Sequence, residues 1–306
     1  MTVGVIVPVY GPAPYLEDAL AGVLGQSPAP DEVIVVDDGS PAAVRVPAPF
    51  ASRCRVLRRD LRGGPGPARD TALAAIATDW IACADADDVW RPGKLAAQLR
   101  ALERFPEAVL CFGTAEIVGP DGRATGERWP TLTAGLLEPA LLGPALYERN
   151  PIPTSSVIAR RDAVVAAGGF SGPPLCEDWS LWLRLIERGG SFVCAPDAVI
   201  SYRRHGDGLT ADVRALAESS LLIHEAHAGL VDEAVRRRVR AGDLVALARG
   251  FVRERQWGNA GSALRDAASL TPLPARERLL RTLVTVPGVR AALGRRAPYS
   301  RRGRGA

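Results

Sequence analysis

The sequence predicts an α/β protein with a mixed, mostly parallel sheet flanked by helices, followed by an all-helical C-terminal region. Strand-like apolar runs alternate with amphipathic helical patterns through about the first hundred residues. Acidic residues directly follow two of these runs, where an open α/β sheet carries its chemistry. From Asp212 onward the apolar residues recur only at helical spacing.

The first two strands and the helix between them predict the parallel arrangement. Val3 to Val9 is apolar throughout, as in a strand covered on both faces. A helical pattern runs from Tyr15 to Leu24, and a second strand, Glu32 to Val36, ends in Asp37-Asp38-Gly39-Ser40. Strand, helix and strand in this order predict a parallel pair with a right-handed crossover.

A third strand, Arg55 to Leu57, leads into a glycine-rich segment, Gly63-Gly64-Pro65-Gly66-Pro67-Ala68-Arg69, and then a helix to Ala77. The segment does not fit a dinucleotide fingerprint, because Arg69 occupies the third glycine position and two prolines remove backbone donors. Two interpretations of Arg69 stay open. It lies near a phosphate or nucleotide at the helix N-terminus, or it is a surface arginine on a flexible turn.

Trp80 to Ala84 predicts a buried strand that ends in three carboxylates, Asp85, Asp87 and Asp88, and Pro92 marks the start of the next helix. Carboxylates this close repel one another unless a cation or donor groups offset the charge, and Mg²⁺ and Mn²⁺ prefer oxygen ligands of this kind. A metal site is one interpretation. The other is a solvated turn in which Asp88 caps the next helix.

The central part of the chain is harder to interpret, and residues 119–155 are rich in Pro and Gly. Further strands are expected at 108–112, 115–118, 156–159, 191–195 and 198–202, with short helices near 136–147 and 162–167. A helix with two tryptophans on one face begins at Glu177-Asp178, and these carboxylates either complement the helix dipole or include a base. His205, on a Gly-rich turn, is a metal ligand or a solvated loop residue.

Composition excludes several classes of protein. The net charge of +4 gathers in the arginines between 295 and 304, so we expect no nucleic-acid partner, and this tail contacts anionic lipid at most. The five cysteines include no Cys-x-x-Cys pair, which favours neither a disulfide framework nor a zinc site. No charged leader and no apolar run of the ~18 residues of a membrane span is found, so we expect a cytoplasmic protein, peripheral to the membrane at most.

Five ordered segments resemble the family 2 glycosyltransferases, which are inverting nucleotide-sugar enzymes of the GT-A fold. The resemblance covers about residues 1–205, and five motifs in order make it far more specific than any one alone. The segments are Val5-Ile6-Val7-Pro8-Val9-Tyr10, Glu32-Val33-Ile34-Val35-Val36-Asp37-Asp38-Gly39-Ser40, Gly66-Pro67-Ala68-Arg69, Asp85-Ala86-Asp87-Asp88-Val89-Trp90-Arg91-Pro92 and Glu177-Asp178-Trp179.

The resemblance implies a role for individual residues. Asp38 would accept from the nucleotide base, with Arg69 nearby, and Asp85 would face the ribose and metal. Asp87 would bind the Mn²⁺ or Mg²⁺ that bridges the diphosphate, and Asp178 would remove the proton from the acceptor hydroxyl. The nucleotide-sugar-binding residues implied are Pro8, Val9, Tyr10, Asp38, Arg69, Asp85, Ala86 and Asp87, and the metal ligands are Asp85, Asp87 and His205.

The same resemblance implies the partners and the domain roles. Residues 1–208 would be the catalytic domain, 209–290 a helical region, and 291–306 a basic, disordered tail. The donor would be a nucleotide sugar, with UDP favoured, and the acceptor a carbohydrate, lipid-linked or other hydroxyl compound in bacterial cell-surface polysaccharide biosynthesis. Gly11 and Asp70 stand where Asn is usual in the family, which leaves the loop geometry near the nucleotide open.

Two alternatives remain. A sugar-phosphate nucleotidyltransferase shares the sheet architecture and the metal, but it would need a basic Gly-rich loop after the first strand, and Tyr10-Gly11-Pro12-Ala13-Pro14 has no basic residue. The second alternative is a non-catalytic carbohydrate-binding or scaffold protein that keeps the fold.

Overall fold

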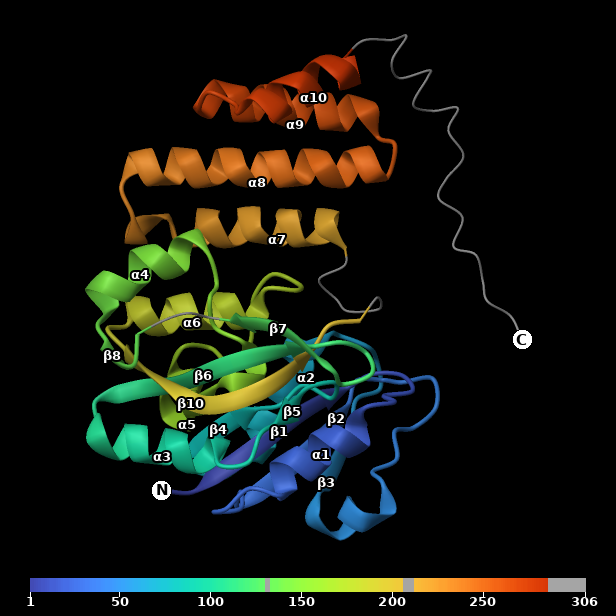
Figure 1. Ribbon diagram of the computed structural model, residues 1–306, viewed down its shortest axis with the longest axis vertical. Coiled ribbons are helices and arrows are strands. Elements are labelled where there is room, and N and C mark those ends of the chain that lie inside the picture. Colours follow the sequence, from blue (N-terminus) through green and yellow to red (C-terminus); the bar gives the residue numbers. More distant parts are fainter. Residues whose placement is uncertain (130–132, 206–211, 286–306) are drawn as a thin grey trace. The chain divides into compact units, whose positions relative to one another are not determined.

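The computed structural model describes residues 1–129, 133–205 and 212–285 (Figure 1). It divides into two compact units, Met1–Leu209 and Thr210–Ala306. The first is the α/β unit and the second is helical. Among the described residues no helix combines the length and apolarity needed to cross a bilayer. The basic tail predicted from Arg295 lies outside the described residues.

A single mixed sheet of ten strands forms the centre of the α/β unit, in the order β3-β2-β1-β4-β9-β6-β10-β5, with β7 beside β6 and β8 beside β10. Six strands (β3, β2, β1, β4, β6 and β10) run in one direction, and the remaining four run against them. The strands are β1 (Val3–Val9), β2 (Glu32–Asp37), β3 (Arg55–Arg58), β4 (Trp80–Cys83), β5 (Val89–Trp90), β6 (Ala108–Val118), β7 (Ala124–Trp129), β8 (Gly135–Leu137), β9 (Ile158–Arg160) and β10 (Ser191–Arg203).

Helices cover both faces of this sheet, and side-chain alternation along β1 explains how. The side chains of Val5 and Val7 point to one face, where they join a core with Leu20 of α1 and Leu95 of α3. On the other face Gly4 leaves room for Ile76, the residue that ends α2. The helices of the unit are α1 (Leu16–Leu24), α2 (Pro65–Ala75), α3 (Lys94–Arg104), α4 (Pro139–Glu148), α5 (Arg161–Ala166) and α6 (Glu177–Glu187), with 3-10 turns at Ala48–Arg53 and Thr154–Ser156.

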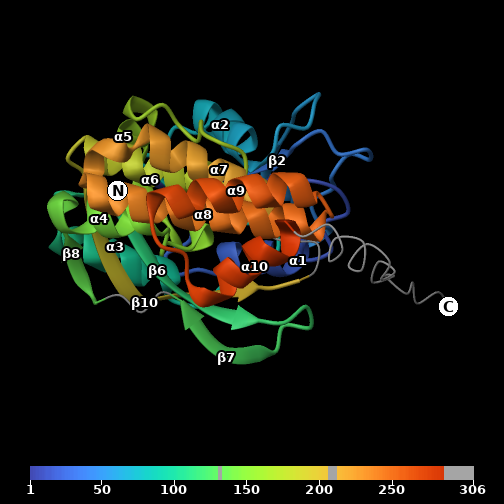
Figure 2. The same ribbon diagram turned by 90° about the horizontal axis from the view of Figure 1, so that it is seen from above.

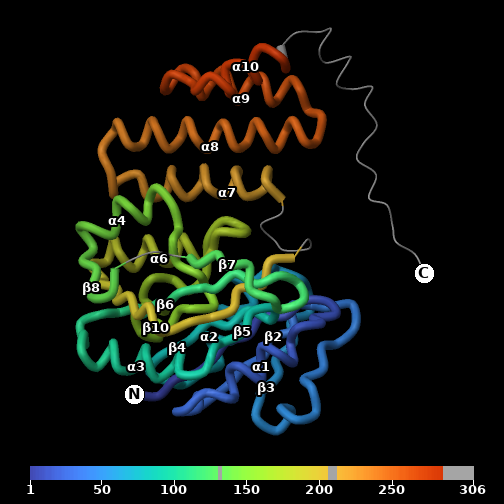
Figure 3. The backbone as a smooth tube through the Cα atoms, viewed as in Figure 1, coloured from blue at the N-terminus to red at the C-terminus, as the bar shows by residue number. Residues whose placement is uncertain are grey.

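The chain path through β6 and β10 differs from our prediction (Figure 3). We predicted two strands in each region, and the structure has one long strand in each. Their register shifts between Cys194 and Val199, where β10 bulges. A Cβ atom at Gly113 would lie 1.8 Å from the carbonyl oxygen of Ala198, so the two strands approach here as only glycine allows. Pairing between strands therefore continues across what the sequence suggested was a break.

Three further strands were not predicted. β8 occupies the start of the region where we expected a helix near 136–147, and the helix there, α4, begins only at Pro139. β7 pairs antiparallel with the end of β6 and extends it as a hairpin (Figure 2). β5 consists of Val89 and Trp90 only and pairs with β10. β5 forms by pairing with β10, which is distant in the sequence, and β7 forms by folding back onto β6. Neither β5 nor β7 therefore needs the long apolar run of a buried strand.

The helical unit contains α7 (Val213–Ala226), α8 (Glu233–Arg253), α9 (Trp257–Leu270) and α10 (Ala275–Thr285), with a 3-10 turn at Ala228–Leu230. Successive helices pack side by side around a core rich in alanine. The carboxylates of Asp212 and Asp232 accept hydrogen bonds from the backbone N–H of the third residue of α7 and of α8, as N-caps do. The buried His224 contacts Asp243, with 2.6 Å between Nδ1 and Oδ2, and this contact joins α7 to α8.

Candidate active site

The predicted site residues gather at the edge where β1, β2, β4 and β10 end. Because these strands share one direction, the residues that follow them meet at one edge of the sheet. Tyr10 follows β1, Asp38 follows β2, Asp85 follows β4 and His205 follows β10. The structure thus brings together acidic and aromatic residues that are far apart in the sequence.

Arg69 lies at the centre of this edge. Gly64 has a φ of +90°, and Pro65 opens α2, which places Arg69 on the buried side of the helix. Its Nη2 atom donates to Asp85 Oδ1 and its Nη1 atom donates to Glu177 Oε1, both at 2.6 Å. Burial alone would lower the pKa of Arg69, but these two carboxylates raise it above its ordinary value. The structure excludes our interpretation of Arg69 as a surface arginine.

Asp178 occupies the first turn of α6, next to Glu177. Its Oδ1 accepts from the backbone N–H of Trp179 at 2.6 Å, and its Oδ2 accepts from the hydroxyl of Thr154. Burial, and then the charge of Glu177, raise the pKa of Asp178 to about 6. A carboxylate with that pKa is ionised at neutral pH and still basic enough to accept a proton in a reaction.

Asp87 and His205 contact one another, with 2.9 Å between Oδ2 and Nε2. Burial and the charge of Asp85 raise the pKa of Asp87. Within the described residues no three His, Cys, Asp or Glu side chains are arranged to hold a metal ion. The carboxylate oxygen suits Mn²⁺ or Mg²⁺, and a substrate diphosphate would supply further oxygen ligands. The donor set therefore fits a metal that arrives with a diphosphate.

Asp88 does not cap the next helix. Its carboxylate is buried and accepts from the backbone N–H of Arg203 at 3.0 Å, while Gly93 with a φ of +82° precedes α3. Burial, and then the charges of Asp85 and Asp87, raise the pKa of Asp88 well above its ordinary value. The Arg203 side chain donates to the carbonyl of Asp87 at 3.1 Å. The end of β10 is therefore bonded at two points to residues 85–88, which we call the acidic turn.

A network of buried hydrogen bonds holds the backbone of the acidic turn. The hydroxyl of Ser155 accepts from the backbone N–H of Asp85 at 3.0 Å, and its carbonyl accepts from Trp90 Nε1 at 2.9 Å. The ammonium of Lys94 lies 3.5 Å from the centre of the Trp90 ring and donates to Gln98. Burial lowers the pKa of Lys94 to about 7. Asp85 is therefore held through its backbone as well as its side chain.

The residues implied for the nucleotide differ in exposure. Tyr10 is exposed, and the guanidinium of Arg62 lies 4.0 Å from the centre of its ring. Val9 is buried in the core, whereas Pro8 and Ala86 are half-buried. The Asp38 carboxylate accepts from the N–H groups of Gly63 and Gly64 and from Arg59, so it fixes the loop before α2. Its contact with a nucleotide base stays a prediction.

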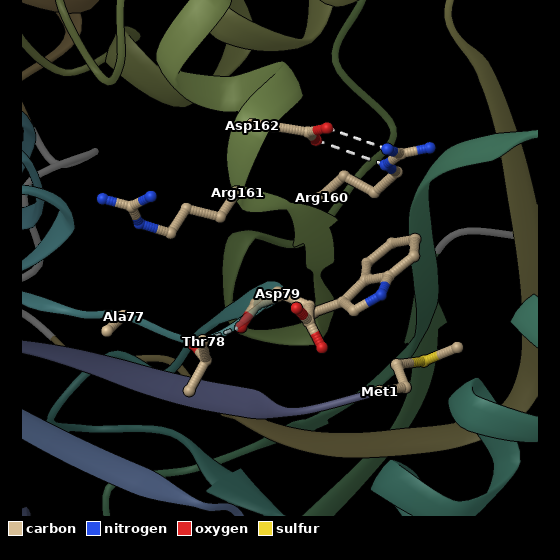
Figure 4. A pocket seen from close by; sticks show the side chains of 8 residues that line it. Met1, Ala77, Thr78, Asp79, Arg160, Arg161 and Asp162 are labelled. Carbon is tan, nitrogen blue, oxygen red and sulfur yellow. Dashed lines mark hydrogen bonds and ion pairs between the residues drawn. The ribbon is translucent and has the colours of Figure 1, made fainter.

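The opposite edge of the sheet, where β4 begins, has a pocket lined partly by charged side chains (Figure 4). Figure 4 shows Arg160 pointing toward Asp162, with 2.8 Å between Nη2 and Oδ2, while Arg161 points away. This pocket lies at the start of β4, whereas the acidic turn follows the end of that strand. Its lining residues are Met1, Ala77, Thr78, Asp79, Trp80, Arg160, Arg161 and Asp162.

Comparison with known proteins identifies the family. The model of glycosyl transferase family 2 matches residues 4–163. The chain belongs to glycosyltransferase family 2. An uncharacterized protein of Mycobacterium bovis is 31% identical over 207 residues, which are 65% of this chain and 58% of that protein. This chain therefore spans less than two thirds of that relative's length.

Two solved structures share the fold. S. aureus TarS 1-349 in complex with UDP-GlcNAc has a TM-score of 0.62 at 19% identity, covering 95% of this chain and 88% of that chain. The mannosyltransferase PcManGT from Pyrobaculum calidifontis, in complex with GDP-Man and Mn²⁺, has a TM-score of 0.55 at 20% identity, covering 95% and 85%. The predicted GT-A fold is thereby confirmed.

The two departures from the usual family 2 sequence have physical explanations. Gly11 has a φ of +78°, in the left-handed region that asparagine and glycine both tolerate, and its N–H donates to Ser40. The Asp70 carboxylate accepts from the N–H of Phe170 at 2.7 Å, a bond that an asparagine side-chain oxygen would also accept. Asparagine could therefore make the same contacts both in the turn that holds Gly11 and in α2, which holds Asp70.

Several residues at this candidate site were not predicted. Thr154 and Ser155 lie in the stretch that we could not interpret, and Arg203 follows the strand that we expected at 198–202. One signal was available for the first two, because Pro153-Thr154-Ser155-Ser156 places three hydroxyl groups just before a strand-like run. Nothing local indicated Arg203, whose side chain donates to Asp18 in α1 and to the carbonyl of Asp87 in the acidic turn.

Proposed function

We propose that the α/β unit transfers a glycosyl group from a nucleotide diphosphate sugar, with UDP favoured, to an acceptor hydroxyl with inversion of configuration. One observation carries the proposal: Arg69 joins the turn that bears Asp85 and Asp87 to the helix start that bears Asp178. A donor-binding turn and a base are then close enough to act on one substrate. Family membership favours this function over the nucleotidyltransferase alternative.

In the proposed reaction Asp178 accepts the proton of the acceptor hydroxyl, and Thr154 keeps the carboxylate oriented. The acceptor oxygen forms a bond to the anomeric carbon as the bond from that carbon to the diphosphate oxygen breaks. The diphosphate leaves with the electron pair from the opposite face, so one displacement inverts the configuration. Mn²⁺ or Mg²⁺, when bound by Asp87 and His205 beside Asp85, supplies positive charge that stabilises the departing diphosphate.

The donor class is supported by the solved relatives of the same fold, one of which holds UDP-GlcNAc and another GDP-Man with Mn²⁺. Tyr10 offers an exposed ring at the end of β1 on which a base can stack. The acceptor class stays open between carbohydrate, lipid-linked and other hydroxyl compounds. Peripheral membrane contact also stays a proposal.

Thermal unfolding with UDP, GDP or dTDP, each with and without Mn²⁺, tests donor binding. A ligand at 100 times its Kd stabilises the folded state by about 2.7 kcal/mol, so we expect a clear rise in Tm with UDP and Mn²⁺. Asp87→Ala should remove the Mn²⁺-dependent part of that rise, and Asp162→Ala at the opposite edge is the matched control. No rise with any nucleotide in the parent would refute the proposal. Binding without transfer from a panel of UDP-sugars would favour the scaffold alternative.

A further inference from the structure

Glu177 precedes the proposed base and has no role in the proposed reaction, yet it is one of the few buried carboxylates of the α/β unit. Its Oε1 atom accepts from Arg69 at 2.6 Å. The other terminal nitrogen of Arg69 donates to Asp85. Glu177 is therefore connected to Asp85 of the acidic turn through a single arginine.

The charges explain why the two carboxylates share one arginine. A buried carboxylate is costly unless it is paired, and the planar guanidinium can serve two acceptors with separate N–H groups. The side chains of Arg69 and Glu177 are 4% and 9% exposed, whereas Asp85 is 29% exposed. The buried end of this bridge is thus Glu177, and the end that faces the solvent is Asp85.

The packing leaves little freedom at the buried end. A Cβ atom at Gly66 would lie 3.0 Å from Glu177 Cγ and 2.7 Å from the carbonyl oxygen of Phe170. The first turn of α2 therefore lies directly against the Glu177 side chain. The ring of Phe170 also lies 5.5 Å from the guanidinium of Arg69. Glu177 and Arg69 are held by their neighbours, and Asp85 is the more exposed end of the arrangement.

We propose that Glu177 is a positioning residue for the donor site: it anchors Arg69, and Arg69 fixes the Asp85 carboxylate in the orientation that receives the donor diphosphate with its metal. The inference rests on the proposed function, because it concerns the same site. The Arg69 contact engages Oδ1 of Asp85, and Oδ2 has no partner among the described residues. That free oxygen is the one placed for a ligand.

Calorimetric titration with UDP, with and without Mn²⁺, tests the role of Glu177. Glu177→Gln keeps the size of the side chain and removes its charge, so Arg69 loses one of its two carboxylates. We expect the affinity for UDP in Mn²⁺ to fall 10- to 100-fold, the effect typical of residues that orient metal ligands, while the affinity without Mn²⁺ stays within about twofold. If the ion pair between Arg69 and Glu177 only stabilised the fold, Glu177→Gln would change the affinity for UDP equally with and without Mn²⁺.

Two further variants make the result specific. Glu277→Gln is the matched control, because Glu277 is a buried carboxylate paired with Arg249 in the helical unit. It should leave both affinities unchanged. Glu177→Asp keeps the charge and should recover part of the Mn²⁺-dependent affinity. Should Glu177→Gln not fold, Arg69→Lys supplies the same comparison, because a lysine cannot donate to both carboxylates in this fixed geometry.

The outcomes separate this inference from the proposed function. Mn²⁺-dependent UDP binding by the parent with no change in Glu177→Gln, or with an equal loss in both conditions, overturns the inference and leaves the proposed function standing. The same holds if Glu277→Gln shows the same loss. A parent that binds no nucleotide in either condition overturns the proposed function, and the inference with it.

Discussion

The two edges of the central sheet carry similar residues in opposite settings. At the carboxyl edge Arg69 is buried and binds carboxylates from two other elements of the chain. At the amino edge Arg160 pairs with Asp162, two positions further on, and both side chains are exposed. Exposed pairs contribute about 0–1 kcal/mol, whereas a buried charge depends on its partner. Two features therefore distinguish the proposed active site: its charged residues are buried, and they come from distant segments of the chain. The number of charges does not distinguish it.

The largest difference between the edges should come from two Asp→Asn substitutions. Asp178→Asn removes the proposed base while the amide oxygen can still accept from Thr154, so we expect the transfer rate to fall about 10²- to 10⁴-fold with the fold intact. Asp162→Asn at the amino edge should keep the parental rate. The rate of UDP-sugar consumption measures both. Parental activity in Asp178→Asn would exclude it as the base.

The pH dependence of the rate should also follow the carboxyl edge. Burial raises the pKa of Asp178 to about 6, so the ionised form is lost as the pH falls through that value, and the rate should drop about tenfold per pH unit below it. At the amino edge hydrogen bonds from Thr2 lower the pKa of Asp79, so Asp79→Asn should leave the profile unchanged. Rates between pH 4.5 and pH 8 test this. A flat profile would contradict it.

The same pKa has an opposite consequence for stability. Because the pKa of Asp178 in the folded state exceeds the value of about 3.9 in an unfolded chain, folding favours the protonated form. Stability from this group is present at low pH and is lost as the pH rises from about 4 to about 6. Asp178→Asn should therefore raise Tm more at pH 7.5 than at pH 4.5. A change in Tm that is equal at both values would show that the pKa is ordinary.

A smaller effect is expected from the tryptophans near each edge. Trp90→Phe leaves the carbonyl of Ser155 without its donor, which should cost about 1–3 kcal/mol of unfolding free energy and reduce UDP affinity in Mn²⁺ through Asp85. Trp80→Phe, next to the amino-edge pocket, is the matched change and should not alter UDP affinity. Urea unfolding and UDP titration measure the two effects. Equal effects on UDP affinity would remove the proposed link between Ser155 and Asp85.

The smallest effect should come from the exposed pair itself. Arg160→Gln breaks the contact with Asp162, and we expect a change within about 0.5 kcal/mol in unfolding free energy and none in UDP affinity. Urea unfolding and UDP titration again suffice. A loss of affinity here would mean that the amino edge contributes to the site.

The sequence predicted the elements whose signal is local. β1, α1 and β2 follow from apolar periodicity, and the acidic turn after β4 follows from three carboxylates at a strand end. β5 and β7 could not be predicted in this way, because a strand of two residues or a polar hairpin arm is formed by its partner. The continuity of β10 depends on its bulge, which only the pairing with β6 makes visible.

The site was predicted as a set of residues rather than as a set of contacts. Motif order identified Asp85, Asp87 and Asp178, but the position of Arg69 was left open. Its partner Glu177 is 108 residues away, and no local pattern reports a contact at that separation. The structure added the buried arginine and, with it, the connection between the acidic turn and the helix that carries the proposed base.

Lys94 is the only lysine in the chain, and it is fully buried beneath Trp90. Amine-reactive reagents therefore find no lysine on the surface of the native protein. Acylation at this one position reports opening of the α/β core, with no fluorescent label or engineered cysteine needed. The kinetics of such labelling would give the opening rate of the layer that supports the acidic turn.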